Sequence, residues 1–228
     1  MPTIEGRLIP ANHTKGRAGL LSEVIVLHIM EGTLMGTDAW FHNPNSNAST
    51  NFGVGKDGRI FQWVADEDTP WANGVVNDPD MDNIFIKGWL ARGENFNTRT
   101  FSIEHEGYTG EPWTDAMYKS STWLCAEIMR YFPNIRDTWN NNPEVRRQLI
   151  IGHYQIDYIN RKNCPGSGVD FDKYISMVDK ELNPIPQPPQ PPVESCETKL
   201  AKANEEIKRL NTELAKYKKY TGELYVKA

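Results

Sequence analysis

Proline is concentrated in one short stretch of the chain, with six prolines among the nine residues at 184–192. Proline fixes the backbone φ angle and carries no N–H, so such a run continues neither a helix nor a strand and forms a stiff, extended spacer. The spacer predicts a globular domain at residues 1–183, a linker at 184–193 and a separate segment at 194–228. The first part is long enough to bury a core of its own.

The C-terminal segment contains a repeat whose members are spaced alternately four and three residues apart, as in the seam of a coiled-coil helix. Charged residues lie between the seam positions, as a solvated helix requires. We expect this helix to form a homo-oligomer, because the spacer holds it away from the domain; docking onto the domain is the alternative. The seam comprises Cys196, Leu200, Ala203, Ile207, Leu210, Leu214, Tyr217, Thr221 and Leu224.

Composition argues against several kinds of partner. The whole chain has a net charge of −5, although residues 194–228 hold eight Lys or Arg and only six Asp or Glu. The domain is therefore acidic, which argues against nucleic acid as its partner. No apolar run approaches the roughly 20 residues that cross a bilayer, and no secretory signal is visible at the N-terminus. We expect the protein to be synthesised in the cytoplasm without a signal peptide. We do not expect it to insert into a membrane.

Hydrophobic patterning predicts strands and helices within the domain. Residues 22–30 are apolar almost without a break, as in a central strand that is covered on both faces. The Asp57-Gly58 pair predicts the turn of a β-hairpin. Residues 75–97 show no clear period, so this stretch either builds a binding surface or packs as a covering loop. Further strands are expected at 100–108 and 149–152, helices at 115–131, 143–148 and 170–182, and turn-rich segments at 31–51 and 132–142.

Two histidines and a cysteine suggest a metal site. His28 lies near the end of one apolar strand, His153 follows another, and Cys164 lies in the loop that comes next. Three protein ligands leave a fourth tetrahedral position for water, which is the pattern of a catalytic zinc. Lys162 would add a cation suited to stabilising an oxyanion, and Glu104 could move a proton from water to a leaving amine. Together these residues predict hydrolysis of an amide.

Each of these residues also has a simpler interpretation. His28 could be a core histidine that bonds a backbone carbonyl, and Cys125 is expected to be a small core residue. Glu104 and Glu106 lie on the same face of one strand, where solvent exposure is the usual explanation for carboxylates. Alternation along the strand does not choose between these two glutamates.

In its motifs the chain resembles the type 2 N-acetylmuramoyl-L-alanine amidases, a family that includes phage lysins and is related to peptidoglycan recognition proteins. The resemblance covers residues 20–182. It rests on His28 at the end of its strand, Asn51-Phe52-Gly53-Val54, Lys56-Asp57-Gly58, Ile60-Phe61-Gln62, Pro70-Trp71-Ala72-Asn73-Gly74, Ser102-Ile103-Glu104, Gly152-His153 and Lys162-Asn163-Cys164-Pro165-Gly166.

The resemblance implies an α/β fold with a mixed central β-sheet flanked by helices. It also implies zinc (Zn2+) held by His28, His153 and Cys164, and cleavage of the bond between the lactyl group of N-acetylmuramic acid and L-alanine in peptidoglycan. In the family pattern Glu104 matches the acid/base carboxylate, which favours it over Glu106, and Lys162 matches the oxyanion-stabilising cation.

The substrate loops depart from the family pattern in two places. Thr50 precedes Asn51 where some phage members carry a tyrosine before a His-Phe pair. The loop at Trp71 and Asn73 reads Trp-Ala-Asn-Gly in place of the common Trp-His-Ala-Gly. We expect these four residues to bind substrate, with contacts that differ from those of relatives.

The resemblance predicts an enzyme that degrades the bacterial cell wall, as a bacteriolytic phage endolysin does. One alternative is a non-catalytic peptidoglycan-binding module, although binding-only relatives commonly lack the cysteine ligand that is present here as Cys164. A second alternative is a virion or structural protein that is organised by its coiled coil.

Overall fold

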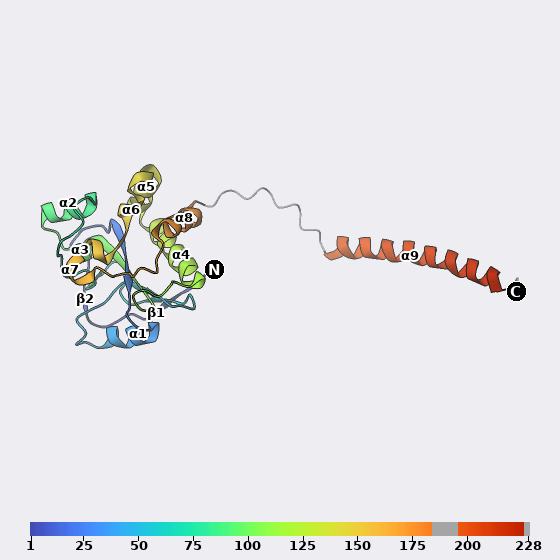
Figure 1. The fold of residues 1–228 in the computed structure, drawn as a ribbon, viewed down its shortest axis with the longest axis horizontal. Helices are drawn as coiled ribbons and strands as arrows, with labels where there is room; N and C mark the ends of the chain where they lie inside the picture. Colours follow the sequence, from blue (N-terminus) through green and yellow to red (C-terminus); the bar gives the residue numbers. More distant parts are fainter. Residues whose placement is uncertain (184–195, 226–228) are drawn as a thin grey trace. The chain divides into compact units, whose positions relative to one another are not determined.

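The computed structural model of the protein describes residues 1–183 and 196–225 (Figure 1). Side chains are described for residues 1–183 and 200–214. The chain divides into two units, Met1–Pro184 and Ile185–Ala228, and each is described by itself. The linker predicted at 184–193 lies outside the described residues, and the predicted domain boundaries stay predictions.

The first unit is built on a mixed six-stranded sheet in the order β1-β5-β4-β7-β3-β8. β3 runs parallel to β7 and to β8, and β7 runs parallel to β4. β4 and β5 form the predicted antiparallel hairpin. The α/β class with a mixed central sheet is thus confirmed. The strands are β1 (Ile4–Gly6), β3 (Val24–Ile29), β4 (Phe52–Val54), β5 (Ile60–Gln62), β7 (Thr100–His105) and β8 (Ile150–Gly152).

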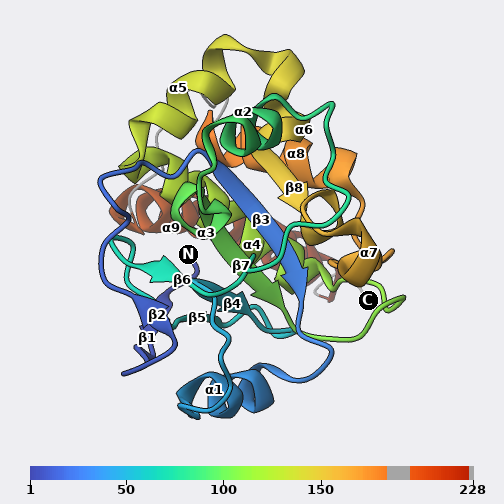
Figure 2. The same ribbon diagram turned by 90° about the vertical axis from the view of Figure 1, so that its left-hand side faces the viewer.

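Helices cover both faces of this sheet, as Figure 2 shows. The side chains of β3 alternate between the faces. Ile25 and Leu27 pack in one core cluster with residues of α4 and α8, whereas Val24 and Val26 pack in another with residues of α2 and α3. This two-sided burial explains the unbroken apolar run of β3. These helices are α2 (Ile84–Arg92), α3 (Phe96–Arg99), α4 (Asp115–Tyr131) and α8 (Phe171–Leu182).

Shorter elements complete the unit. Leu34 and Phe41 of α1 pack in a third core cluster with Trp63. β2 pairs with β6 in a small separate sheet, and two short helical turns follow β8. These elements are α1 (Leu34–His42), β2 (His13–Thr14), β6 (Thr69–Pro70), α5 (Pro133–Asn141), η1 (Pro143–Val145), α6 (Arg146–Leu149), η2 (His153–Gln155) and α7 (Tyr158–Arg161).

The two segments that were expected to lack regular structure before β7 contain helices instead. In α1 the hydroxyl group of Thr33 caps the helix by accepting from the backbone N–H of Gly36. In α2 the side chain of Asn83 caps the first turn, and Gly93 ends the helix at a φ of 63°. Both helices are only 9 residues long, and caps rather than a long apolar period define helices of this length.

The turn-rich segment predicted at 132–142 is also a helix, α5. Pro133 occupies the first turn, where its missing N–H costs nothing. Ile135 and Trp139 lie one turn apart and are both buried. The prediction was wrong because the asparagines of this segment favour turns locally, whereas the burial of two large side chains favours the helix.

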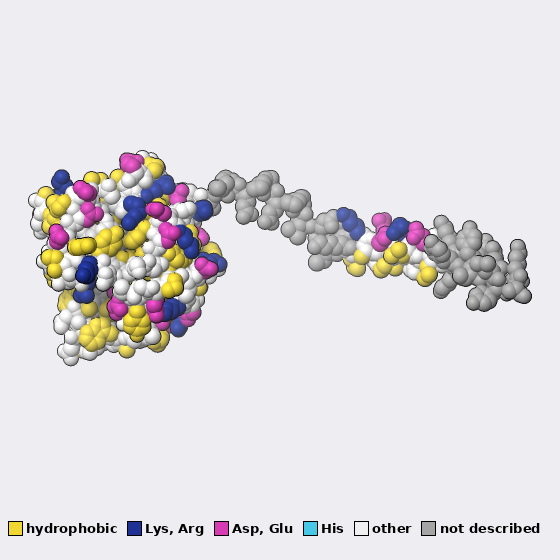
Figure 3. Space-filling view, viewed as in Figure 1, with side chains coloured by type: hydrophobic (Ala, Val, Ile, Leu, Met, Phe, Trp, Pro, Cys, Tyr) yellow, Lys and Arg dark blue, Asp and Glu magenta, His cyan; other side chains and the backbone are white. Residues whose placement is uncertain are grey.

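The second unit contains α9 (Cys196–Tyr225). Every residue from 200 to 214 is exposed in the single chain, including the seam residues Leu200, Ile207 and Leu214 at 62%, 55% and 52%. Figure 3 shows hydrophobic side chains along one side of this stretch and charged ones along the other. Pairing with a second copy stays a prediction. Among the described helices, none has the length and apolarity needed to cross a membrane.

Candidate metal centre

Three parallel strands bring the candidate site residues to one edge of the sheet. The carboxyl ends of β3, β7 and β8 meet at this edge, which is where open α/β sheets bind their ligands. In this register His28 on β3 is the partner of Glu104 on β7, and Leu27 is the partner of Gly152 on β8. His153 follows Gly152 directly, so it reaches the same edge beside His28.

The predicted metal ligands form one buried cluster. The donor atoms of His28, His153 and Cys164 all lie within 4.8 Å of one another, and the centroids of the two rings are 4.5 Å apart. Nε2 of His28 is buried without a hydrogen-bond partner, while Sγ of Cys164 accepts from the backbone N–H of Ile29 at 3.4 Å. Two imidazoles and one thiolate are ligands that zinc prefers, and three of them leave a position open for chemistry. These residues therefore fit a zinc ion.

The electrostatics of the cluster also suit a cation. Burial, followed by the charges of His153 and other neighbours, lowers the pKa of His28 well below its usual value. Burial lowers the pKa of His153 to about 4, so both rings are neutral at neutral pH, as metal ligands must be. Burial, and then the nearby charge of Glu104, raises the pKa of the Cys164 thiol. A bound cation would reverse the effect on this thiol.

Glu104 contributes a carboxylate to the cavity that contains the metal cluster. Its Oε2 atom is buried without a hydrogen-bond partner. Burial raises the pKa of Glu104 to about 8; the charge of Arg161 opposes this shift, and the charge of Glu31 adds to it. Glu106, in contrast, accepts a hydrogen bond from the backbone N–H of Lys56 at 2.7 Å, in the turn of the β4–β5 hairpin. Alternation along the strand did not choose between the two glutamates, whereas their contacts do: Glu104 lies in the cavity and Glu106 bonds the hairpin turn.

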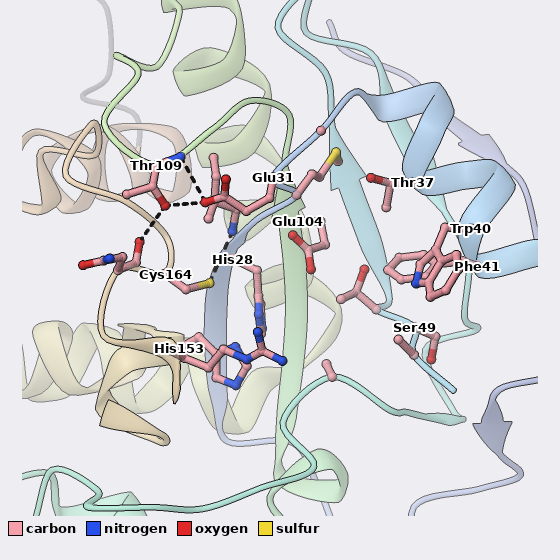
Figure 4. A pocket seen from close by; sticks show the side chains of 18 of the residues that line it. His28, Glu31, Thr37, Trp40, Phe41, Ser49, Glu104, Thr109, His153 and Cys164 are labelled. Carbon is pink, nitrogen blue, oxygen red and sulfur yellow. Dashed lines mark hydrogen bonds between the residues drawn. The ribbon is translucent and has the colours of Figure 1, made fainter. Parts of the chain in front are cut away.

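The cluster and Glu104 lie in one open cavity with a volume of about 680 Å3. One wall comes from α1, another from residues 159–164, and a third from residues 48–50 and 71–72. Figure 4 shows Cys164 and His153 on one side of the cavity and Trp40 and Thr37 on the other, with Glu104 between them. A substrate in this cavity can therefore be contacted on both sides of the metal cluster.

Three further predicted site residues line the same cavity. Lys162 is exposed, and its ammonium group has no partner among the residues that the structure describes. Thr50 is 2% exposed and Trp71 is 39% exposed. The positions of these residues are compatible with their predicted roles, which stay predictions.

The other two predicted substrate contacts, Asn51 and Asn73, do not line this cavity. Both side chains are buried, at 0% and 1% exposure. Oδ1 of Asn51 accepts from the backbone N–H of Ser102 at 3.2 Å, and Nδ2 of Asn73 donates to Oγ1 of Thr100 at 2.9 Å. These hydrogen bonds attach both loops to β7, and the expected role of Asn51 and Asn73 in substrate binding stays a prediction.

The cavity also contains residues that sequence reasoning missed. Arg161 lines it, and its positive charge acts on His28, Glu104, His153 and Cys164. Adjacent Lys162 drew attention through its family match, although the two cations stand together in the sequence. Trp40 of α1 was missed because α1 itself was not predicted.

Glu31 is a third such residue. Its backbone is left-handed, with a φ of 49°, which is uncommon for a residue other than glycine. Its carboxylate accepts from the backbone N–H of Thr109 at 3.1 Å and also from the Thr109 hydroxyl group. This contact links the segment after β3 to the segment after β7, next to the metal cluster.

A buried chain of hydrogen bonds supports His28 from behind the sheet. Nδ1 of His105 lies 2.9 Å from the carbonyl oxygen of His28, and its Nε2 lies 2.7 Å from the hydroxyl group of Ser121. This hydroxyl group in turn bonds Tyr174 at 2.5 Å. Burial lowers the pKa of His105 to about 3, so the ring stays neutral. The chain connects the metal-binding end of β3 to α4 and α8.

An α/β domain that brings two histidines, a cysteine and an unpaired glutamate into one cavity has the composition of a metal-dependent hydrolase. Residues 19–167, more than half of the chain, match the family model described as N-acetylmuramoyl-L-alanine amidase. The chain therefore belongs to the N-acetylmuramoyl-L-alanine amidase family, and its globular domain is an amidase domain of that kind.

Individual relatives agree with this assignment. The chain is 31% identical over 125 residues to the 1,6-anhydro-N-acetylmuramyl-L-alanine amidase AmpD of Haemophilus influenzae. The aligned residues make up 55% of this chain and 55% of AmpD, so the chain spans about half the length of that relative. It is 24% identical over 168 residues to N-acetylmuramoyl-L-alanine amidase A of Achromobacter lyticus, covering 69% of this chain and 84% of that protein.

Solved structures show the same fold. An AmpD derivative superposes with a TM-score of 0.57 at 21% identity, covering 76% of this chain and 94% of that one. A mutant endolysin from Bacillus subtilis superposes with a TM-score of 0.50 at 17% identity, covering 78% of this chain and 99% of that one.

Proposed function

We propose that the protein hydrolyses the amide bond between N-acetylmuramic acid and L-alanine in peptidoglycan, and that this reaction depends on zinc. The observation that carries the proposal is the approach of three donor atoms, from His28, His153 and Cys164, to within 4.8 Å of one another. They lie in one cavity with Glu104, whose carboxylate oxygen Oε2 is buried without a hydrogen-bond partner. Membership of the family supports the substrate class.

The residues of the cavity have separate roles in the proposed reaction. A zinc ion held by His28, His153 and Cys164 would polarise the amide carbonyl group and make water a better nucleophile. Glu104, with its pKa raised to about 8, takes a proton from the attacking water and then donates it to the leaving nitrogen of L-alanine. Lys162 stabilises the carbonyl oxygen as it gains negative charge.

Two variants separate metal binding from proton transfer. We expect Cys164→Ala to lose both zinc and turnover, because two imidazoles alone hold the ion weakly. We expect Glu104→Gln to keep zinc and to lose turnover by a factor of roughly 100 or more, the contribution of a general base. Zinc content is measured by metal analysis, and turnover is measured as the release of free amino groups from peptidoglycan.

Glu106→Gln is the matched control for Glu104→Gln, since Glu106 lies on the same strand but bonds the hairpin turn. It should keep both zinc and turnover. Equal loss in the two glutamine variants would contradict the role of Glu104. Lysis by a correctly folded but zinc-free protein would contradict the metal site.

A non-catalytic peptidoglycan-binding module is the second candidate. It predicts that the zinc-loaded protein holds muropeptide without releasing stem peptide. The cysteine ligand favours the enzyme, because His28, His153 and Cys164 complete a three-ligand catalytic set.

We further propose that the protein acts on the bacterial cell wall as a phage endolysin and that α9 associates with α9 of a second copy. The endolysin proposal draws support from the amidase family of the domain. It is tested by producing the protein in bacterial cytoplasm with and without a pore-forming protein. Lysis only when both are present supports the proposal, and lysis that never follows contradicts it.

A further inference from the structure

Resting on the proposed function, we propose an orientation for the substrate in the cavity: the sugar stacks on Trp40 of α1, and the carboxylates of the stem peptide bind Arg161 at the end of α7. The substrate has two chemically different parts that match these two binding positions. On one side of its scissile amide bond it carries an uncharged N-acetylated sugar, and on the other a peptide with free carboxylates.

The wall formed by α1 is aromatic and uncharged. Trp40 is 52% exposed although it lines the cavity, and its indole N–H has no partner among the described residues. The other α1 residues in this wall are Gly36, Thr37 and Phe41, none of which is charged. A large exposed aromatic ring in a cavity offers a flat apolar face with one polar atom, which suits the C–H face and hydroxyl groups of a sugar.

The opposite wall is cationic. Arg161 and Lys162 both line the cavity, and neither side chain has a hydrogen-bond or ion-pair partner within residues 1–183. An unpaired guanidinium group binds carboxylates in two-pronged geometry. The exposed carboxylate of this region, Glu31, bonds Thr109 and not these cations. The charge of Arg161 is therefore available to a ligand.

The reacting groups lie between the two walls. Figure 4 shows Glu104 between Trp40 on one side and Cys164 with His153 on the other. Arg161 belongs to the side of Cys164, because both residues lie in the segment 159–164 that forms this wall of the cavity. An amide bond held at Glu104 thus has the aromatic wall on one side and the cationic wall on the other.

The orientation is tested by titrating the zinc-loaded full chain with two probes that lack the scissile bond. N,N′-diacetylchitobiose represents the uncharged sugar, and L-alanyl-D-glutamate represents the peptide, with its diamide as the uncharged match. Trp40→Ala should weaken binding of the sugar about tenfold and change peptide binding less than about twofold. Arg161→Gln should do the reverse and remove the preference for the dipeptide over its diamide.

Two controls accompany these variants. Trp40→Phe should recover part of the sugar affinity because it restores an aromatic face. Arg136→Gln on α5, which is distant from the cavity wall and paired with Asp137, should change neither affinity.

The proposal is overturned if each variant weakens both probes equally, if the two effects are exchanged, or if the wild-type protein binds either probe no better than the Trp40→Ala, Arg161→Gln double variant. Release of stem peptide from whole peptidoglycan is measured on the same preparations. A protein that releases peptide but shows none of the expected binding pattern contradicts the orientation alone. A protein that releases no peptide contradicts the proposed function.

Discussion

Glu104 is a partly buried residue whose carboxylate oxygen Oε2 is buried without a partner, and this combination defines its chemistry. An ordinary glutamate has a pKa near 4.5, whereas burial raises that of Glu104 to about 8. A base whose pKa lies near the working pH can both accept and return a proton. The same burial has a cost, because the folded protein without a metal must keep this carboxyl protonated or bury its charge unpaired.

Glu104→Gln should therefore alter how the stability of the metal-free protein depends on pH. The raised pKa favours folding at pH below 4.5, and this contribution is lost as the pH rises towards 8. Glutamine cannot ionise, so the variant should equal the wild type near pH 4.5 and become more stable than it by a few kcal/mol near pH 8. Unfolding by denaturant in the presence of a chelator measures this difference.

Glu106→Gln serves as the control, since its carboxylate is exposed to solvent at the hairpin and bonds a backbone N–H. It should not reproduce the gain at pH 8. A pH-independent difference between Glu104→Gln and the wild type would show that Glu104 is not held in a buried, protonated state.

Gly152 packs closely against the loop that carries Cys164. A Cβ atom on this residue would lie 2.5 Å from the Tyr154 ring and 2.7 Å from Cδ of Pro165. Pro165 follows Cys164 directly, so Gly152→Ala should displace the cysteine ligand. We expect a loss of about 1–3 kcal/mol in stability and about a 10- to 100-fold loss in zinc affinity.

Chelator competition measures the zinc affinity of Gly152→Ala, and thermal unfolding measures its stability. Gly6→Ala on β1 is the control, because a Cβ atom there meets nothing within 4 Å. Wild-type zinc affinity in Gly152→Ala would mean that the loop can move without disturbing Cys164.

At the scale of elements, the sequence was most informative where burial imposed a long pattern. Three elements were predicted: the unbroken apolar run of β3, the hairpin of β4 and β5, and the long helix α4. Each of them has a pattern that extends over many residues. α1, α2 and α5 were missed, since each has 9 residues and depends on caps and a few buried side chains.

The candidate site follows the same logic. His28, His153 and Cys164 could be found because their residue types are rare and chemically specific, and they lie at the ends of predicted strands. The bonds of Asn51 and Asn73 to β7 could not be predicted, because a sequence does not distinguish an exposed amide from one that bonds a neighbouring strand. Arg161 and Trp40 have no pattern of their own, and only the folded cavity reveals them.

The cap of α2 provides a test at this scale. Asn83 is 1% exposed, accepts from the backbone N–H groups of Phe85 and Ile86, and donates to the carbonyl oxygen of Gln148 at 3.2 Å. Asn83→Ala should lower the free energy of unfolding by about 1–3 kcal/mol. Exposed Asp82→Ala should stay within about 0.5 kcal/mol of the wild type. Denaturant titration compares them, and equal stability in both variants would contradict the cap.

At the scale of the whole molecule, the amidase domain and α9 are predicted to act independently. The cavity and its ligands lie entirely within the first unit, while α9 exposes an apolar seam. A protein truncated after residue 183 should keep its zinc and its specific activity on soluble muropeptide. Sedimentation should show an oligomer for the full chain and a monomer for the truncated one.

Ile207→Asp provides the matched test of the seam, because it places a charge at the middle of the apolar stripe. It should convert the full chain to a monomer and leave zinc binding unchanged, whereas Lys208→Asp on the charged side should leave the oligomer intact. A monomeric wild-type chain at all concentrations would contradict self-association through α9.

The reaction itself is tested most directly by mass analysis of peptidoglycan digested with the purified, zinc-loaded protein. The predicted products are glycan strands with free lactyl carboxyl groups and stem peptides that begin with L-alanine. Both products should be absent when a chelator is added, and also when the Glu104→Gln variant replaces the wild-type protein. Products cut at a sugar–sugar or peptide–peptide bond, or an undiminished yield in the presence of the chelator, would contradict a zinc amidase.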